Sequence, residues 1–287
     1  MPTNTLAPTH VQATLAATTE ICTAGVTTCA MCGAEYYATQ YFGITPPCAR
    51  CLVACRREES AAFTRQHQAD RERAEHAARI ERGRAAMGAP DKYATVTIED
   101  FDVTAPDDPA ASRLLTRKRD AALAYIRQFP DRGDPDACFP QVVVMMGGPG
   151  TGKTMMSIAM GHASIRAGAT VLWTRTADLV ANLRESWSGT GPSERSRLVV
   201  YRSADLLIID ELSRGALMNR PTTHLYDVVA DREAELRPTI ITTNDGIPGL
   251  ASLIGAPLVS RIDGAGEVWD FGHRDYRRVL GARRRAR

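Results

Sequence analysis

The 287 residues of this chain can form one large domain, or one ordinary domain with a smaller appendage. A hydrophobic content of 44% and a charged content of 24% fit a folded protein, and the net charge of +2 indicates no particular partner. No apolar run approaches the roughly 20 residues of a membrane-spanning helix, and the N-terminal residues do not resemble a signal peptide. We therefore expect a cytoplasmic protein without a membrane partner.

Six of the seven cysteines lie between Cys22 and Cys55. In a reducing compartment such cysteines are more often metal ligands than disulfide partners. Two Cys-x-x-Cys pairs have the spacing of a zinc ribbon and predict one Zn²⁺ held by four thiolates: Cys29, Cys32, Cys48 and Cys51. The flanking Cys22 or Cys55 could replace one ligand, and free buried thiols are the remaining alternative. The isolated Cys138 is expected to be a small buried residue.

The predicted zinc module, residues 1–55, is almost uncharged, because Glu20, Glu35 and Arg50 are its only formal charges. Phosphate contacts dominate non-specific binding to nucleic acids, so this composition favours a protein partner. Residues 56–89 are rich in arginine and acids and predict an exposed helix that serves as a connector.

Residues 90–287 have the pattern of an α/β domain. After a helix predicted at 110–129, five short apolar runs alternate with helical segments. Near-continuous apolar strands separated by helices predict a parallel sheet that is covered on both faces. The five strands are expected at 142–146, 170–174, 206–210, 239–243 and 267–271, with helices at 153–167, 176–187 and 224–235.

A sequence of the form G-x-x-x-x-G-K-[ST] lies between the first of these strands and the next helix. Its glycines allow backbone N–H groups to surround phosphate oxygens, and the helix N-terminus adds the positive end of its dipole. Lys153 is expected to reach the β- and γ-phosphates of ATP, and the Thr154 hydroxyl to bind Mg²⁺. The predicted phosphate-binding residues are Gly147, Gly148, Pro149, Gly150, Thr151, Gly152, Lys153 and Thr154.

Polar residues at two later strand ends complete this predicted site. Asp210 and Glu211 follow an apolar run, so Asp210 is expected beside the Mg²⁺ and Glu211 where it can polarise a water molecule. Asn244 ends the fourth strand with an amide able to orient that water. Acids at strand ends and asparagines in turns are also common without any such role, which is the alternative for these three residues.

The order of these elements resembles an AAA+ ATPase, and more closely the replicative helicase loaders of the DnaC/DnaI group with their relative IstB. The resemblance runs from about Pro90 to Val279. Its motifs are Tyr93…Phe101, Ala177-Asp178-Leu179, Arg184-Glu185-Ser186-Trp187, Leu207-Ile208-Ile209-Asp210-Glu211, Arg237-Pro238-Thr239 with Thr243-Asn244, and Trp269 followed by Asp275-Tyr276-Arg277. It implies an AAA+ domain that uses ATP and Mg²⁺ and assembles with copies of itself through its ATP sites.

The resemblance also implies further site residues. In such proteins Ser260-Arg261 ends a helix that presents an arginine finger to the ATP of a neighbouring subunit; the alternative for Arg261 is a surface arginine. Trp187 matches an aromatic position implicated in contact with single-stranded DNA. Helical spacing places Arg184 one turn before it, and Arg220 is expected to extend the same groove, with less support. The alternative for Trp187 is packing within the domain.

The leading interpretation is an ATP-dependent replicative helicase loader that places a ring helicase on single-stranded DNA and grips that helicase through its N-terminal module. An IstB-like transposition helper ATPase, which binds duplex DNA and a transposase, is the alternative. The zinc module favours the loader, because such helpers generally lack one. A non-catalytic DNA-binding adaptor is a third interpretation, against which the intact Asp210-Glu211 pair argues.

Overall fold

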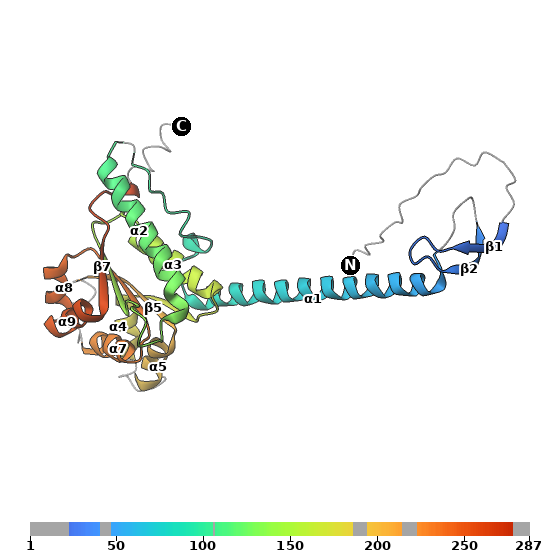
Figure 1. Ribbon diagram of the computed structural model, residues 1–287. Coiled ribbons are helices and arrows are strands. Elements are labelled where there is room, and N and C mark those ends of the chain that lie inside the picture. Colours follow the sequence, from blue (N-terminus) through green and yellow to red (C-terminus); the bar gives the residue numbers. More distant parts are fainter. Residues whose placement is uncertain (1–22, 41–46, 106, 186–193, 214–222, 278–287) are drawn as a thin grey trace. The chain divides into compact units, whose positions relative to one another are not determined.

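The computed structural model describes residues 23–40, 47–105, 107–185, 194–213 and 223–277 (Figure 1). The chain divides into two compact units, Met1–Ala74 and Glu75–Arg287. None of the helices among the described residues has the length and apolarity needed to span a bilayer. The sequence predicted a division at residues 55 and 89 instead, and that three-part division stays a prediction.

The first unit contains a β-hairpin and the beginning of a long helix. Strands β1 (Thr23–Thr28) and β2 (Glu35–Gln40) pair in antiparallel fashion, with Val26 opposite Tyr37. The turn between them is closed by Cys29 N–H donating to Ala34 O at 2.8 Å. Gly33 has a φ of +72°, a conformation that glycine adopts without steric cost.

Helix α1 (Ala49–Met87) confirms the predicted charged helix but begins earlier, directly after Cys48. Most of its residues are exposed, as the charge-rich sequence predicts. Only its last residue, Met87, is fully buried among those described, and it packs into the core of the second unit, to which it belongs.

The second unit is built on a five-stranded parallel sheet, as predicted. Its strands are β3 (Val142–Met146), β4 (Val171–Arg175), β5 (Leu206–Leu212), β6 (Thr239–Thr243) and β7 (Gly266–Asp270). They lie in the order β4-β5-β6-β3-β7, and every neighbouring pair is parallel. The carboxyl ends of β3, β5 and β6 therefore meet at one edge of the sheet.

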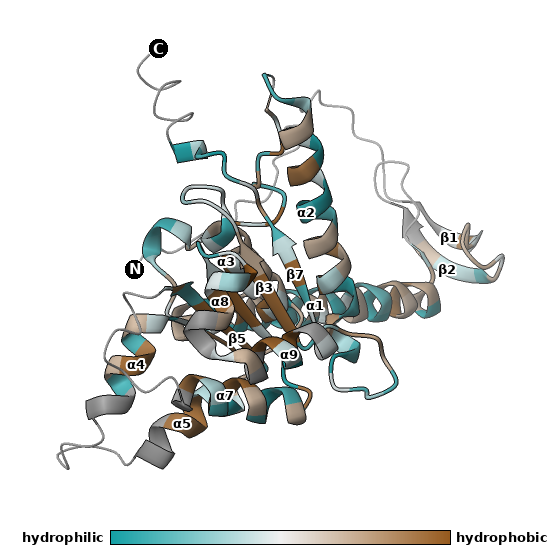
Figure 2. Ribbon diagram, turned by 90° about the vertical axis from the view of Figure 1, so that its left-hand side faces the viewer, coloured by the Kyte–Doolittle hydropathy of each residue, from teal (hydrophilic) through white to brown (hydrophobic). Residues whose placement is uncertain are grey.

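Two hydrophobic cores cover the two faces of the sheet. Because side chains alternate along a strand, Val143 and Met145 enter one core, and Val142 and Val144 enter the other. Figure 2 shows the apolar strands enclosed by helices. The first core is covered by α2 (Pro109–Gln128) and α3 (Lys153–Arg166), and the second by α4 (Thr176–Glu185), α5 (Glu194–Ser203), α7 (Thr223–Ala234), α8 (Ile247–Ile254) and α9 (Ala256–Ala265).

Two short 3-10 helices complete the second unit, η1 (Asp91–Tyr93) and η2 (Phe129–Asp131). The loop after η2 carries Cys138, which the structure places in an exposed position. The expectation of a buried Cys138 is therefore wrong. Its neighbours explain the difference, because the aspartates and the glycine before Cys138 keep this loop at the surface, and Phe139 is the residue that enters the core.

Candidate nucleotide-binding site and cysteine cluster

The predicted phosphate-binding loop lies between β3 and α3, at the carboxyl edge of the sheet. Gly147 and Gly150 have φ values of +142° and +74°, which side chains rarely permit. A Cβ atom on Gly147 would lie 2.6 Å from the backbone oxygen Gly272 O. Gly147 is therefore needed both for its backbone conformation and for its close approach to the C-terminal segment, and Gly150 for its backbone conformation.

Lys153 is buried and folds back onto its own loop. Its Nζ donates to Gly147 O and Gly148 O at 2.7 Å and to Thr151 Oγ1 at 3.3 Å. Oδ1 of Asn244, directly after β6, is a fourth acceptor at 2.9 Å, so the three N–H groups are shared among four oxygens. Burial lowers the pKa of Lys153 to about 8, although Asp210 opposes this shift. The ammonium group is thus satisfied by oxygen acceptors that phosphate oxygens can replace.

Thr154 and Asp210 meet as the predicted magnesium site requires. Thr154 Oγ1 donates to Asp210 Oδ1 at 3.0 Å, and the side chain of Asp210 is buried at the end of β5. Hydroxyl and carboxylate oxygens are the ligand atoms that Mg²⁺ prefers. The donor set at this position therefore fits a magnesium ion.

Glu211 follows Asp210 and is exposed toward the pocket. Its φ is +59°, which is unusual for a residue with a side chain. Thr242 of β6 contacts both acids, because its hydroxyl donates to Asp210 Oδ1 at 2.5 Å and accepts from Glu211 N–H at 3.0 Å.

Lys153, Thr154, Glu211 and Asn244 line one pocket with a volume of about 280 Å³. Six further residues that line it had no predicted site role: Tyr93, Met155, Thr242, Thr243, Tyr276 and Arg277. Four of them, all except Met155 and Thr242, lie in motifs that carry the family resemblance, which was the available signal. Tyr276 N–H donates to Gly150 O at 3.0 Å, so the C-terminal segment is attached directly to the phosphate-binding loop.

The expectation that Arg261 ends its helix is wrong, because α9 continues to Ala265. The residues after Arg261 include no proline and do not break the helix before β7 begins. Arg261 is exposed, and its guanidinium donates to Glu233 Oε2 of α7 at 2.5 Å. It does not line the pocket of its own chain, and its role as an arginine finger stays a prediction.

The predicted DNA contacts fall largely outside the described residues. Trp187 and Arg220 lie in the ranges 186–193 and 214–222, which the structure does not describe. Arg184 lies in α4, but its side chain is likewise outside the description. These three assignments stay predictions.

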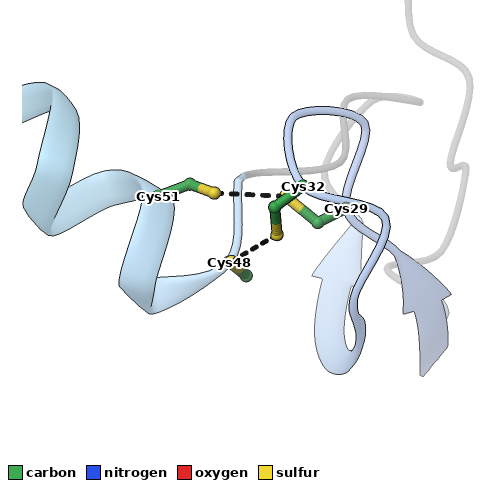
Figure 3. Close-up of side chains that lie close together, drawn as sticks. All are labelled: Cys29, Cys32, Cys48 and Cys51. Carbon is green, nitrogen blue, oxygen red and sulfur yellow. Dashed lines mark hydrogen bonds between the residues drawn. The ribbon is translucent and has the colours of Figure 1, made fainter.

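In the first unit, the four predicted zinc ligands converge (Figure 3). Cys29 and Cys32 come from the turn of the hairpin, and Cys48 and Cys51 from the start of α1. Their sulfur atoms all lie within 4.8 Å of one another, with 3.8 Å between Cys29 and Cys51 and 3.6 Å between Cys32 and Cys48. Backbone N–H groups, chiefly that of Cys48, lower the pKa of Cys29 to about 6.

This cluster fits a zinc ion. A tetrahedral site with Zn–S bonds of about 2.3 Å separates its sulfur atoms by about 3.8 Å, close to the distances observed. Cys55 lies in α1 and is not part of the cluster, and Cys22 lies outside the described residues. Among the described cysteines, the predicted set of four therefore needs no substitute ligand.

The sheet, the phosphate-binding loop and the acids of β5 define a P-loop protein of the AAA+ type. Residues 56–259 match the family described as IstB-like ATP binding protein. This match covers more than half of the chain, and the chain belongs to that family.

Individual relatives agree with this assignment. The chain is 28% identical over 163 residues to the replicative helicase loader DnaC of Escherichia coli (strain K12), covering 56% of this chain and 65% of that protein. It is 29% identical over 160 residues to a putative ATP-binding protein of insertion sequence IS21 from Pseudomonas aeruginosa, covering 55% and 54%. The chain thus spans less than two thirds of the length of these curated relatives.

Solved structures share the fold. The crystal structure of the DnaC helicase loader aligns with a TM-score of 0.51 at 21% identity, over 63% of this chain and 99% of that chain. The crystal structure of DnaI aligns with a TM-score of 0.50 at 17% identity, over 66% and 96%. These likenesses confirm the predicted AAA+ fold, and the DnaC relatives confirm the resemblance to the helicase-loader group.

Proposed function

We propose that this protein is an ATP-dependent replicative helicase loader, an ATPase that places a ring helicase on single-stranded DNA. The observation that carries the ATPase part is the convergence of Lys153, Thr154 and Glu211 on one pocket, with Asp210 hydrogen-bonded to Thr154. The helicase part rests on the relatives that are named replicative helicase loaders. Hydrolysis of ATP controls the assembly of the protein with its partners, and its outcome is a rearranged complex.

In this proposal each group of the pocket has one task. Lys153 leaves its carbonyl acceptors and binds the β- and γ-phosphates, while the loop N–H groups bind the remaining oxygens. Thr154 and Asp210 hold Mg²⁺, which neutralises phosphate charge when bound. Glu211 polarises the attacking water and Asn244 orients it. A neighbouring copy supplies Arg261, which must leave Glu233 of its own chain to do so.

The N-terminal module is the proposed grip on the helicase. In this proposal residues 1–55 are the zinc module, residues 56–89 connect it to the ATPase domain, and residues 90–287 are the ATPase domain. The grip is supported by the scarcity of charge in the module and by its exposed apolar side chains. Val26 and Tyr37 are directly opposed on the hairpin and are 71% and 72% exposed. Arg184, Trp187 and Arg220 are the proposed DNA contacts of the ATPase domain.

A second candidate is an IstB-like transposition helper ATPase. The family match and the insertion-sequence relative of Pseudomonas aeruginosa favour it. The two candidates share the ATP site and differ in the partner, a ring helicase with single-stranded DNA in one case and a transposase with duplex DNA in the other.

The deciding experiment is a pull-down of the full chain with the replicative helicase of its host, with and without ATP. We expect nucleotide-dependent capture that is lost in Cys48→Ser, which removes a zinc ligand, and retained in Cys138→Ser, whose thiol is exposed and outside the cluster. A chain that binds duplex DNA tightly and captures no helicase in either state would refute the loader and favour the transposition helper.

A further inference from the structure

An irregularity in the sheet lies at the two acids of the nucleotide site. Along the β5–β6 pair, Ile209 is opposite Ile241 and Leu212 is opposite Thr243. Asp210 and Glu211 therefore share a single partner position, that of Thr242. Such a β-bulge redirects the side chains at its centre, and bulges are frequent beside active sites. Here the bulge directs the side chain of Asp210 toward the buried edge of the site and leaves Glu211 exposed toward the pocket.

The bulge requires an unusual backbone at Glu211. Its φ of +59° lies in the left-handed region, where L side chains are rarely found and persist only when their surroundings hold them. A regular strand would send Asp210 and Glu211 to opposite faces of the sheet. Some contact must therefore keep Glu211 out of the regular conformation.

The hydroxyl of Thr242 provides such a contact. It accepts a hydrogen bond from Glu211 N–H at 3.0 Å and donates one to Asp210 Oδ1 at 2.5 Å. One buried oxygen atom thus connects the backbone of one acid to the carboxylate of the other. On the other side of the bulge, Thr243 Oγ1 donates to Leu212 O at 2.8 Å, so two successive side chains of β6 define where the bulge begins and ends.

We infer that Thr242 is a positioning residue for ATP hydrolysis, whose hydroxyl holds Glu211 in the left-handed conformation and fixes its place relative to Asp210. The inference rests on the proposed ATPase function. Thr242 itself takes no part in the reaction, because its hydroxyl is already engaged by the two acids. Its removal should lower the catalytic rate more than the affinity for nucleotide, because Lys153 and the loop do not depend on it.

The first test compares Thr242→Val, which keeps the shape and loses the hydroxyl, with Thr242→Ser, which keeps the hydroxyl. We expect kcat for ATP to fall about tenfold or more in Thr242→Val, with KM changed less than about threefold, and to be largely restored in Thr242→Ser. Thr174→Val is the matched control, since Thr174 is a buried threonine of β4 whose hydroxyl bonds to the neighbouring Arg175 O. Equal kcat in Thr242→Val and wild type would overturn the inference, as would equal losses in the serine and valine variants.

The second test does not depend on turnover. With Thr242 present, Glu211→Gly should melt about 2–4 °C above Glu211→Ala, because glycine tolerates positive φ and alanine does not. In the Thr242→Val background the backbone is free to leave this conformation, and the difference in melting temperature should disappear. A difference of equal size in both backgrounds would overturn the inference. A wild-type protein that never hydrolyses ATP would instead refute the proposed function, while this second test would still decide the role of Thr242.

Discussion

The largest stability effect we expect from a single substitution falls outside the nucleotide pocket, at Arg232 of α7. This side chain is completely buried, and burial lowers its pKa only to about 10, so the guanidinium is charged at neutral pH. It donates to the carbonyl oxygens of Tyr201, Arg202, Ala204 and Pro238 at 2.7–3.0 Å and to Thr239 Oγ1 at 3.1 Å.

These contacts join α7 to α5 and to β6, and β6 contributes residues to the nucleotide pocket. The first carbonyls lie at the C-terminal end of α5, where a helix has no internal donors and its dipole favours a cation. Pro238 and Thr239 lie at the start of β6 (Thr239–Thr243), the strand that carries Thr242 and is followed by Asn244. Arg232→Met would fill much of the volume and remove the donor that the carbonyls of Tyr201, Arg202 and Ala204 share, whereas Pro238 O would keep its hydrogen bond from Leu207 N–H. Each buried acceptor without a partner costs about 1–3 kcal/mol, and relief of the buried charge offsets part of the total. We expect a net loss of about 3–5 kcal/mol.

Urea unfolding of the full chain, followed by circular dichroism, measures this loss. Arg237→Met is the matched control, because Arg237 also donates to a carbonyl at the end of α5, that of Ser203, but has a 38% exposed side chain and an exposed ion pair with Glu235. Exposed pairs contribute about 0–1 kcal/mol. If Arg232→Met destabilised the protein no more than Arg237→Met, the inference that Arg232 holds α5 and β6 together would be refuted.

Four further predictions concern the site and the module. Lys153→Ala should abolish binding of a fluorescent ATP analogue, whereas Glu211→Gln should bind it and stop hydrolysis; turnover by Glu211→Gln at the wild-type rate would exclude Glu211 as the group that activates water. Arg261→Ala should keep ATP affinity and lose hydrolysis, and a mixture with Lys153→Ala should recover activity; an inactive mixture, with assembly verified, contradicts a role between subunits. The purified chain should carry about one Zn²⁺, and chelation should weaken helicase capture while nucleotide binding persists; metal analysis without zinc would count against the module. Trp187→Ala should weaken single-stranded DNA binding about tenfold or more, with ATP affinity unchanged. An unchanged DNA affinity would indicate that Trp187 packs within the domain and does not contact DNA.

Local sequence patterns predicted much of this protein. Runs rich in apolar and β-branched residues marked all five strands within a residue or two, because strands covered on both faces are built mostly from such residues. The phosphate-binding sequence and the two Cys-x-x-Cys pairs indicated their sites, since the ligands within each motif are only a few residues apart in the sequence. The long helix was predicted with its charge-rich exterior, although its start at Ala49 inside the second cysteine pair was not.

What the tertiary structure decided was every relation between segments distant in sequence. The placing of β3 between β6 and β7 brings Asn244 to Lys153, and no local pattern specifies that order. The same holds for Arg232, whose partners lie in α5 and at the start of β6, and for Thr242, an ordinary strand residue by sequence. Its importance arises only because β5 bulges opposite it, and a bulge depends on pairing with a neighbouring strand, which the residues of one strand cannot reveal.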